Sequence, residues 1–164
     1  MSSAGESAVY AALEGLGIAY KRHEHPAVFT VEQARQYWAD IPGMHCKNLF
    51  LRNKKGNRHY LVIIEYSKKA DLKGLARILG EETLSLASEE RLAKYLGLTA
   101  GAVSPYGLLN DGEKAVAVIL DSALRGDGII YFHPNVNTAT IGVGFADFER
   151  FLAWRGNELR RVSL

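Results

Sequence analysis

The sequence predicts an α+β fold in a single domain. Segments with the 3.6-residue spacing of amphipathic helices intermix with short apolar runs typical of strands. They do so without a strict βαβ alternation, which argues against a doubly wound sheet. The chain has 164 residues, enough for one domain with a sizeable core. Because we find no internal repeat, linker or low-complexity tract, residues 1–164 are expected to form one domain.

The composition is that of a soluble globular protein, with 48% hydrophobic and 23% charged residues. The N-terminus lacks the pattern of a signal peptide, and no apolar run approaches the ~18 residues that span a bilayer. The single cysteine, Cys46, cannot form an internal disulfide, which fits a reducing compartment. A net charge of +2 neither requires nor excludes a nucleic-acid partner. We therefore expect a cytoplasmic protein without membrane contact.

Helices are predicted where apolar residues recur at helical spacing. Thr30, followed three residues later by Gln33, fits a capping box, and Phe29 and Ala34 are placed for a hydrophobic staple. This pattern predicts a helix that begins near Val31. Glycines end several of the other helices. The predicted helices cover residues 5–16, 31–38, 71–79, 88–96 and 145–154.

Strands are predicted from short apolar runs bounded by glycine, proline or asparagine. The pair Gly56-Asn57 is typical of a hairpin turn, so the runs 49–51 and 59–64 are expected to pair. The predicted strands cover residues 18–25, 49–51, 59–64, 84–86, 115–120, 128–132, 139–141 and 159–162.

One segment, Gly101-Ala-Val-Ser-Pro-Tyr-Gly-Leu-Leu-Asn-Asp111, combines chain breakers with apolar anchors. Glycine lets a ligand approach the main chain closely. Pro105 fixes its own φ and pushes Ser104 toward an extended conformation. The local pattern alone fits either a tight connection or a loop shaped around a ligand.

Three other stretches accompany this loop: His25-Pro-Ala-Val-Phe-Thr-Val-Glu-Gln-Ala34, Cys46-Lys-Asn-Leu-Phe-Leu-Arg52 and Phe132-His-Pro-Asn-Val-Asn-Thr-Ala-Thr-Ile141. In order and spacing, the four motifs resemble the YbaK/prolyl-tRNA-synthetase-associated domain family over most of the chain. The resemblance implies a curved, barrel-like mixed sheet surrounded by helices. It also implies hydrolysis of amino acids wrongly attached to tRNA. The sequence is most similar to the freestanding branch that removes alanine from proline tRNA.

The resemblance assigns roles to individual residues. Lys47 matches the family's lysine, whose ammonium could hold a phosphate or the developing oxyanion of the ester. Gly101 and Ala102 match the loop that abuts the ester and could supply backbone N–H donors. His133 matches a histidine that lines the amino-acid pocket, and we assign it to substrate binding. The other expected substrate contacts are Phe29, Thr30, Asn48, Val103, Ser104 and Pro105. Asn137 and Thr138 are expected to make turn and strand hydrogen bonds.

Two nucleophile arrangements are alternatives to this assignment. A triad of Ser104, His133 and Asp111 lacks the Gly-x-Ser-x-Gly nucleophile elbow. Cys46 could pair with a histidine, either His45 or His25. Neighbouring residues of a strand point to opposite faces, however, which weakens the pairing of Cys46 with His45.

A metal site is not expected, because His23-Glu-His25 has no third ligand at metal spacing. The resemblance implies no cofactor. Instead it implies a positioned water, helped by the terminal ribose hydroxyl of the tRNA, since hydrolysis of an activated ester needs orientation and oxyanion stabilisation.

The expected partner is aminoacylated tRNA, with proline tRNA favoured, and not DNA. Association with a synthetase and the oligomeric state stay open; Tyr37 and Trp38 fit either a partner surface or the core.

Phosphate contacts are predicted from the basic residues of the hairpin, and a second basic cluster follows it; a solvated surface is the alternative for both. The hairpin cluster comprises Arg52, Lys54, Lys55 and Arg58, and the second cluster comprises Lys68, Lys69 and Lys73.

Three other functions remain open from the sequence. The chain could remove cysteine or serine from tRNA, bind RNA without catalysis, or bind a small ligand. Lys47 and the complete Gly101–Pro105 loop argue against an RNA-binding module without catalysis.

Overall fold

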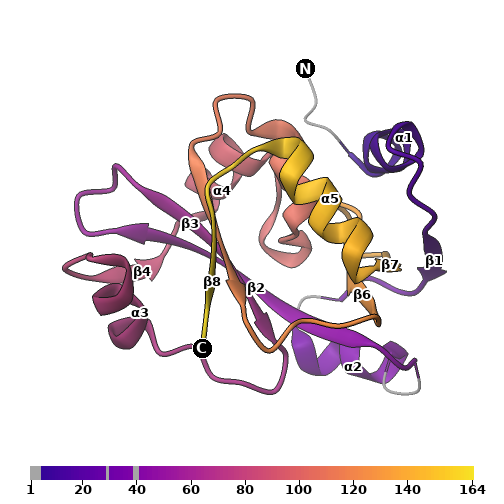
Figure 1. The fold of residues 1–164 in the computed structure, drawn as a ribbon, viewed down its shortest axis with the longest axis horizontal. Coiled ribbons are helices and arrows are strands. Elements are labelled where there is room, and N and C mark those ends of the chain that lie inside the picture. The colour runs from indigo at the N-terminus through magenta and orange to yellow at the C-terminus, as the bar shows by residue number, and fades with distance from the viewer. Residues whose placement is uncertain (1–4, 29, 39–40) are drawn as a thin grey trace.

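The computed structural model describes residues 5–28, 30–38 and 41–164, except for the side chain of Val31. The predicted substrate contact Phe29 lies outside this range. The α+β class is confirmed, with helices on both sides of a mixed sheet (Figure 1). The helices are α1 (Glu6–Gly15), α2 (Val31–Trp38), α3 (Leu72–Leu79), α4 (Glu89–Leu96) and α5 (Phe145–Arg155), with two 3-10 helices, η1 (Ala100–Ala102) and η2 (Pro105–Asn110).

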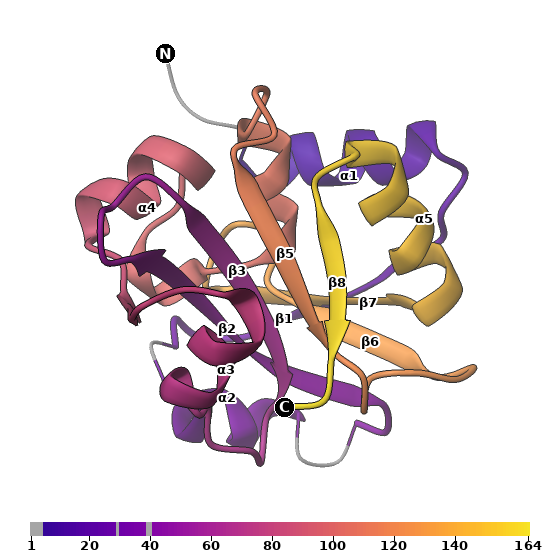
Figure 2. The same cartoon turned by 60° about the vertical axis from the view of Figure 1, so that its left-hand side comes forward.

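The eight strands form one sheet with the order β1-β7-β6-β2-β3-β5-β8, and β4 pairs with β2 beside this path. The sheet is strongly bent, so β6 and β7 run across the direction of β5 and β8 (Figure 2). The strands are β1 (Lys21–Glu24), β2 (Met44–Asn53), β3 (His59–Glu65), β4 (Leu84–Leu86), β5 (Val116–Asp121), β6 (Ile129–Phe132), β7 (Ala139–Gly144) and β8 (Leu159–Val162).

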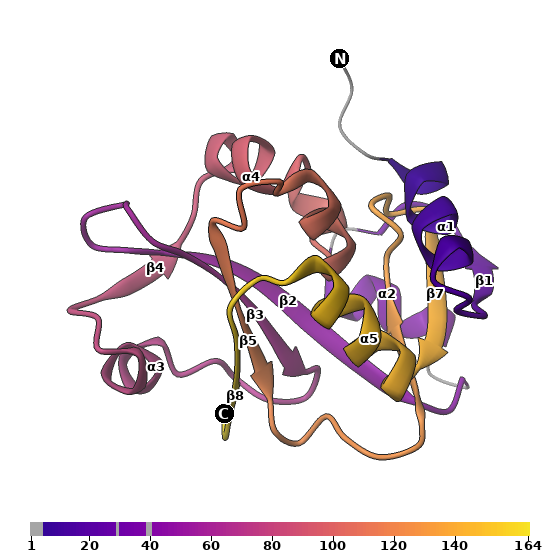
Figure 3. The ribbon, with the colours of Figure 1, turned by 45° about the horizontal axis from the view of Figure 1, so that its top comes forward.

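Two apolar clusters cover the two faces of the central strands. Alternate residues of β3 divide between them, because successive side chains of a strand point to opposite faces. Leu61 and Ile63 belong to the larger cluster, with α1, α4, η2 and α5. Val62 and Ile64 belong to the smaller cluster, which includes α3. β3 and β5 are therefore buried on both faces, and α4 and α3 lie on opposite sides of β2 and β3 (Figure 3).

The predicted hairpin is present, but its first strand is longer than predicted. β2 begins at Met44 rather than at Leu49, since Met44 and His45 pair in parallel with β6 while Cys46 to Arg52 pair with β3. These pairings join distant parts of the chain, and the polar character of residues 45–48 hides the strand in the sequence. The segment 101–111, predicted as a loop, contains η1 and η2.

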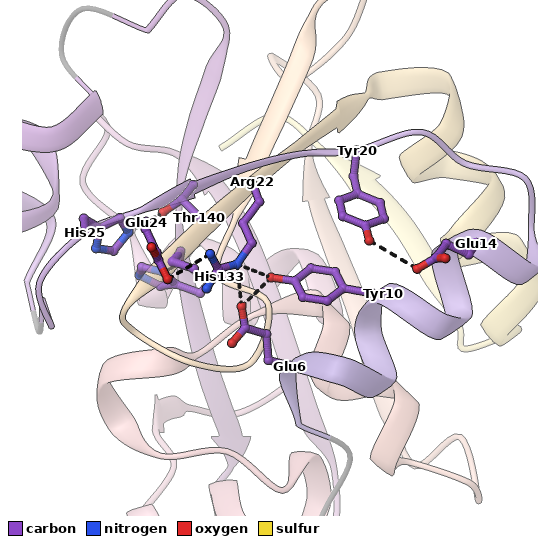
Figure 4. A network of polar contacts seen from close by, with 10 residues as sticks. Glu6, Tyr10, Glu14, Tyr20, Arg22, Glu24, His25, His133 and Thr140 are labelled. Carbon is purple, nitrogen blue, oxygen red and sulfur yellow. Dashed lines mark hydrogen bonds and ion pairs between the residues drawn. The ribbon is translucent and has the colours of Figure 1, made fainter.

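Helix α1 is tied to the sheet by a polar network centred on Arg22 of β1 (Figure 4). The Arg22 Nε donates to Glu6 Oε2 at 2.7 Å and to the Tyr10 hydroxyl at 2.9 Å. Arg22 also forms an ion pair with Glu24 at 3.1 Å. The network holds β1 beside β7, next to the cleft described below.

Within the described part of the chain, no helix combines the length and apolar character needed to cross a bilayer.

Candidate active site

A cleft of about 200 Å³ lies where α2 and the η1 segment approach β2, β6 and β7. Predicted site residues from three of the sequence motifs meet there: Lys47 and Asn48, Gly101 and Val103, and His133. Thr30 also borders the cleft, at the start of α2, where its Oγ1 accepts a hydrogen bond from the Gln33 N–H at 3.1 Å. The remaining lining residues are Val28, Ala34, Trp38, His45, Cys46, Leu49, Ala100, Tyr131, Phe132 and Thr140.

The cleft exists because one edge of β2 is left unpaired for four residues. On that edge β6 pairs only with Met44 and His45, β4 pairs from Leu51 onward, and the Phe50 carbonyl accepts a hydrogen bond from the Ala87 N–H at 2.9 Å. Among the described strands, residues 46–49 therefore pair with β3 on one edge of β2 and with no strand on the other edge. This gap, which we call the β2 gap, exposes the start of the strand to a ligand.

Lys47 lies in the β2 gap, is half-buried and lines the cleft. Its Nζ donates a hydrogen bond to the carbonyl oxygen of Lys68, in the turn after β3. That turn is fixed in place, because the Lys68 Nζ pairs with the buried Asp121 at 3.0 Å. An ammonium has three N–H donors, so two of them remain for a ligand.

The next residue, Asn48, presents an unsatisfied acceptor. Its Oδ1 is buried and accepts no hydrogen bond from the described residues. A buried polar atom without a partner is costly and calls for a ligand or a water. Asn48 also lies on the opposite face of β2 from Lys47, so the two side chains approach the β2 gap from both sides.

The η1 segment contributes one free amide rather than two. The Ala102 N–H donates to the Thr99 carbonyl at 3.0 Å, and the Ala102 side chain is buried. This amide is therefore not available to an oxyanion in this conformation. Gly101 lines the cleft, and no acceptor within the described ranges is bound to its N–H. Of the predicted pair of backbone donors, only Gly101 is free.

The rest of the predicted loop supports the cleft from behind. Val103 lines it, whereas Ser104 is fully buried and its Oγ accepts a hydrogen bond from the Tyr106 N–H at 3.1 Å. Pro105 is buried at the start of η2. Ser104 and Pro105 thus shape the turn, and neither lies among the lining residues.

His133 is held as a hydrogen-bond acceptor. Its Nδ1 lies 2.8 Å from the Ala139 carbonyl oxygen, which can only accept, so Nδ1 carries the proton. Burial, together with the neighbouring His25, lowers the pKa of His133, which keeps the ring neutral. The other ring nitrogen, Nε2, is consequently a free acceptor.

Thr140 is a second acceptor, and His25 fixes its direction (Figure 4). The His25 Nδ1 lies 2.9 Å from the Pro26 carbonyl oxygen, so this nitrogen donates. In the neutral ring Nε2 must accept, and it lies 2.8 Å from Thr140 Oγ1. The hydroxyl proton of Thr140 therefore points at His25, and its lone pairs are left for the cleft.

An aromatic stack that no sequence pattern indicated closes one side of the cleft. The ring of His45 lies between Trp38 of α2, at 4.0 Å, and Tyr131 of β6, at 4.8 Å, both nearly parallel to it. The His45 Nε2 donates to the Ile41 carbonyl at 2.8 Å, and burial lowers the pKa of His45. The stack fixes the end of α2 over β2, so Trp38 acts as a wall of the cleft.

Neither nucleophile arrangement is assembled. Burial raises the pKa of the Cys46 thiol, and Glu65 and Asp121 raise it further, so the thiol is protonated at neutral pH. Asp111 accepts hydrogen bonds from the N–H groups of Ala115 and Val116 and from the side chain of Asn157. Asp111 thus orders the start of β5 and makes no contact with His133.

Across the described ranges, no group of three His, Cys, Asp or Glu side chains is arranged to hold a metal ion. Asn137 agrees with its expected turn role, because its Nδ2 donates to the Val28 carbonyl at 3.0 Å. Thr138 behaves similarly, since its carbonyl accepts from the His25 N–H at 3.0 Å.

The basic hairpin cluster lies at the other end of β2. Lys54 is seven residues from Lys47, which corresponds to roughly 23 Å along a strand. Two of its members already have carboxylate partners: Lys54 pairs with Glu82 at 2.9 Å, and Arg58 lies 4.0 Å from Glu81. The hairpin tip is therefore distant from the cleft, while Lys68 of the second cluster lies next to Lys47.

Comparisons with known proteins place this geometry in one family. The family described as the aminoacyl-tRNA editing domain matches residues 25–151. The prolyl-tRNA editing protein ProX of Acetoanaerobium sticklandii is 42% identical over 164 residues, which cover 100% of both chains. The prolyl-tRNA synthetase associated domain-containing protein 1 of Danio rerio is 40% identical over 131 residues, or 79% of this chain and 71% of its own.

A solved structure has the same fold. It is described as a candidate trans-editing enzyme for prolyl tRNA synthetase, with a TM-score of 0.72 and 25% identity over 100% of this chain and 99% of its own. The expected curved mixed sheet with surrounding helices is thereby confirmed. The chain belongs to the aminoacyl-tRNA editing domain family, as the motifs around Lys47, Gly101 and His133 predicted.

Proposed function

We propose that this protein is a trans-acting deacylase that removes alanine from mischarged proline tRNA. As a member of the editing family it is a hydrolase of the aminoacyl-tRNA ester bond. The observation that carries the finer proposal is the composition of the β2 gap. A lysine ammonium, a free glycine amide and several oriented acceptors surround a small cleft that contains no activated nucleophile.

Lys47 and Gly101 suit the stabilisation of an oxyanion. Attack of water on the ester carbonyl places negative charge on its oxygen, and donors fixed beforehand at that position lower the barrier. Lys47 is held by the Lys68 carbonyl with two N–H groups to spare, and the Gly101 amide is free. Loss of one such donor costs about 3–4 kcal/mol in other enzymes. The ester would then break at the ribose oxygen, with the neighbouring ribose hydroxyl assisting the water.

The acceptors suit the amino group of the esterified amino acid. That group is an ammonium at neutral pH, and it needs acceptors rather than donors. The His133 ring carries its proton on Nδ1, which donates to the Ala139 carbonyl, and the Thr140 hydroxyl donates to His25, so His133 Nε2 and Thr140 Oγ1 can accept. They are close to each other, because His25 contacts both side chains. We assign them to the ammonium, with His25 as the positioning residue for Thr140.

The size of the cleft favours a small amino acid. Its volume of about 200 Å³ is below the roughly 300–1,000 Å³ of sites for drug-sized ligands. A synthetic site built for proline cannot strongly reject alanine, since a methylene is worth only about 1–3 kcal/mol. A second site that admits alanine and excludes proline would correct that error. We propose that the protein acts on mischarged proline tRNA in the cytoplasm, near the synthetase.

The test is a deacylation time course with purified protein. Alanine, cysteine, serine and proline would each be offered on proline tRNA, and alanine would also be offered on its own tRNA. We expect rapid loss of alanine from proline tRNA, and slow or no loss from the other four substrates.

A preference for cysteine or serine would keep the chemistry and replace the amino-acid assignment. Hydrolysis of alanine from both tRNAs at equal rates would remove the proposed tRNA selectivity. If no ester were cleaved, the deacylase proposal itself would fail.

A further inference from the structure

The basic residues of the hairpin lie on two different faces of the sheet. Arg52 shares its face of β2 with Asn48 and Phe50, because side chains two residues apart point the same way. Lys54 and Arg58 instead meet the carboxylates of Glu82 and Glu81. Arg52 therefore lies on the face of β2 that carries Asn48 of the cleft.

Arg52 lies beside a second arginine, Arg91 of α4. The tip of the hairpin lies beside this helix (Figure 2). A β-carbon added to Gly56 would lie 2.8 Å from the Arg91 Nη2 and 3.0 Å from the Arg52 Nη2. The two guanidinium groups thus converge on the same glycine. Lys94, one turn further along α4, borders the same surface depression as Arg91 and Gly56.

These three cations have no carboxylate partner. Within residues 5–28, 30–38 and 41–164, no ion pair is formed by Arg52, Arg91 or Lys94. Glu90 borders the depression without pairing with any of them. The arginines bond to neutral groups instead: Arg52 to the Lys54 carbonyl at 2.9 Å, and Arg91 to the Gly56 carbonyl at 3.0 Å. Neighbouring like charges repel, so this arrangement is best satisfied by an anion.

The same charges act on a buried side chain, the imidazole of His59. His59 lies 2.9 Å from the Arg91 Nη1, so its Nε2 must accept the hydrogen bond and the ring is neutral. Burial lowers the pKa of His59 to about 4, with contributions from Arg91, Arg52 and Lys94. A positive potential is thus concentrated at this site, where Arg52, Arg91 and Lys94 form no ion pair with a described residue.

The position of the cations relative to the cleft identifies the anion. Arg52 is four residues from Asn48 on the same face of β2, or roughly 13 Å along the strand. The chain runs from α4 directly into Gly101 at the cleft. A tRNA whose esterified end occupies the cleft would bring backbone phosphates over this surface within a few nucleotides. Arginine pairs well with phosphate because its planar fork can donate two hydrogen bonds at once.

We propose that Arg52, Arg91 and Lys94 form a phosphate clamp for the tRNA backbone next to the esterified end. The clamp rests on the proposed function, since the tRNA end must occupy the cleft. Of the predicted hairpin cluster, the clamp keeps Arg52 in place of Lys54, Lys55 and Arg58. It adds Arg91 and Lys94 of α4, which the hairpin cluster did not include.

The experiment measures binding of uncharged proline tRNA by fluorescence anisotropy at several salt concentrations. R52Q and K94Q are each expected to weaken binding about 5- to 10-fold at low salt. Each should reduce the slope of log K against log salt by roughly 0.7–0.9, the value for one lost phosphate contact. K54Q removes the same charge from the same hairpin, and it should leave affinity and slope unchanged. Lys94 is exposed, so K94Q tests the clamp without disturbing the hairpin.

R52K is expected to recover most of the slope of log K against log salt that R52Q loses. It keeps the positive charge at this position but lacks the planar guanidinium that can donate two hydrogen bonds at once. The clamp is rejected if R52Q and K94Q bind like the wild type, or if K54Q weakens binding as much as they do. The same wild-type preparation is assayed for deacylation. If the wild type hydrolyses the ester and the variants bind tRNA as well as it does, the clamp alone is rejected. If the wild type neither binds tRNA nor hydrolyses the ester, the proposed function is rejected as well.

Discussion

The two ends of β2 use basic residues in opposite ways. At the cleft end, the Lys47 ammonium is held by a backbone carbonyl and keeps two donors free. At the hairpin tip, Lys54 and Arg58 lie against carboxylates, which is the usual arrangement on a solvated surface. The contrast teaches that the number of positive charges in a segment does not identify a binding site. What identifies it is a cation that the fold positions without neutralising.

The strongest test of this contrast removes one lysine charge at each end of β2 in turn. Lys47→Ala is expected to lower kcat for deacylation by about 100- to 1,000-fold, because an oxyanion donor is lost. Lys54→Ala should change kcat by less than about twofold. Single-turnover kinetics on alanyl-proline tRNA measure both, and urea unfolding confirms that the variants are folded. Comparable losses in both variants would contradict the distinction between the two ends.

A second test uses the pH dependence of the free energy of unfolding, to which His59 beside the hairpin contributes. The folded protein keeps His59 neutral down to pH about 4, whereas the unfolded chain takes up this proton near pH 6.5. The unfolded state therefore binds more protons within this window, and stability falls as the pH is lowered. From pH 6.5 to 5 the loss due to His59 should be about 1.5 kcal/mol. Urea unfolding of the wild type and of His59→Phe at both pH values measures it.

His59→Phe keeps a ring against Phe50 and Tyr95 and removes the titrating group. If both proteins lose the same stability between the two pH values, burial and the neighbouring cations do not lower the pKa of His59 as inferred.

The smallest effect concerns the acceptors of the cleft. Thr140→Val should raise KM for the alanyl ester about tenfold, with less change in kcat, because one hydrogen bond to a charged group is lost. The lactyl ester, which carries a hydroxyl in place of the ammonium, should be cleaved equally by the wild type and the variant. His25→Gln keeps an acceptor for the Thr140 hydroxyl and should resemble the wild type. An equal loss on both esters would indicate a purely structural role for Thr140.

Much of the fold could be predicted because its signals are local. Helix α2 begins where the Thr30 capping pattern places it, and α3, α4 and α5 each end at a left-handed glycine. The start of β2 could not be predicted, since residues 44–48 are mostly polar and become a strand only through β3 and β6. Pairing between distant segments leaves no periodic trace in either one.

The candidate site likewise divides into residues found from local motifs and residues found only in the structure. Lys47, Gly101 and His133 were found through motifs and do line one cleft. Thr140 was overlooked, although it belongs to the same motif as Asn137, because its importance depends on the contact with His25. Arg91 had no signal at all in the sequence. Its proximity to Arg52 arises only when α4 packs beside the hairpin.

The β2 gap also bears on solubility. An unpaired strand edge exposes N–H and C=O groups that can recruit a strand from another molecule and so begin aggregation. Strands of globular proteins usually pair over about five or six residues, and the gap offers only residues 46–49. Trp38 of α2 and the η1 segment stand on either side of it. An unpaired edge of four residues, enclosed in this way, is thus a poor template for the addition of a strand from another molecule.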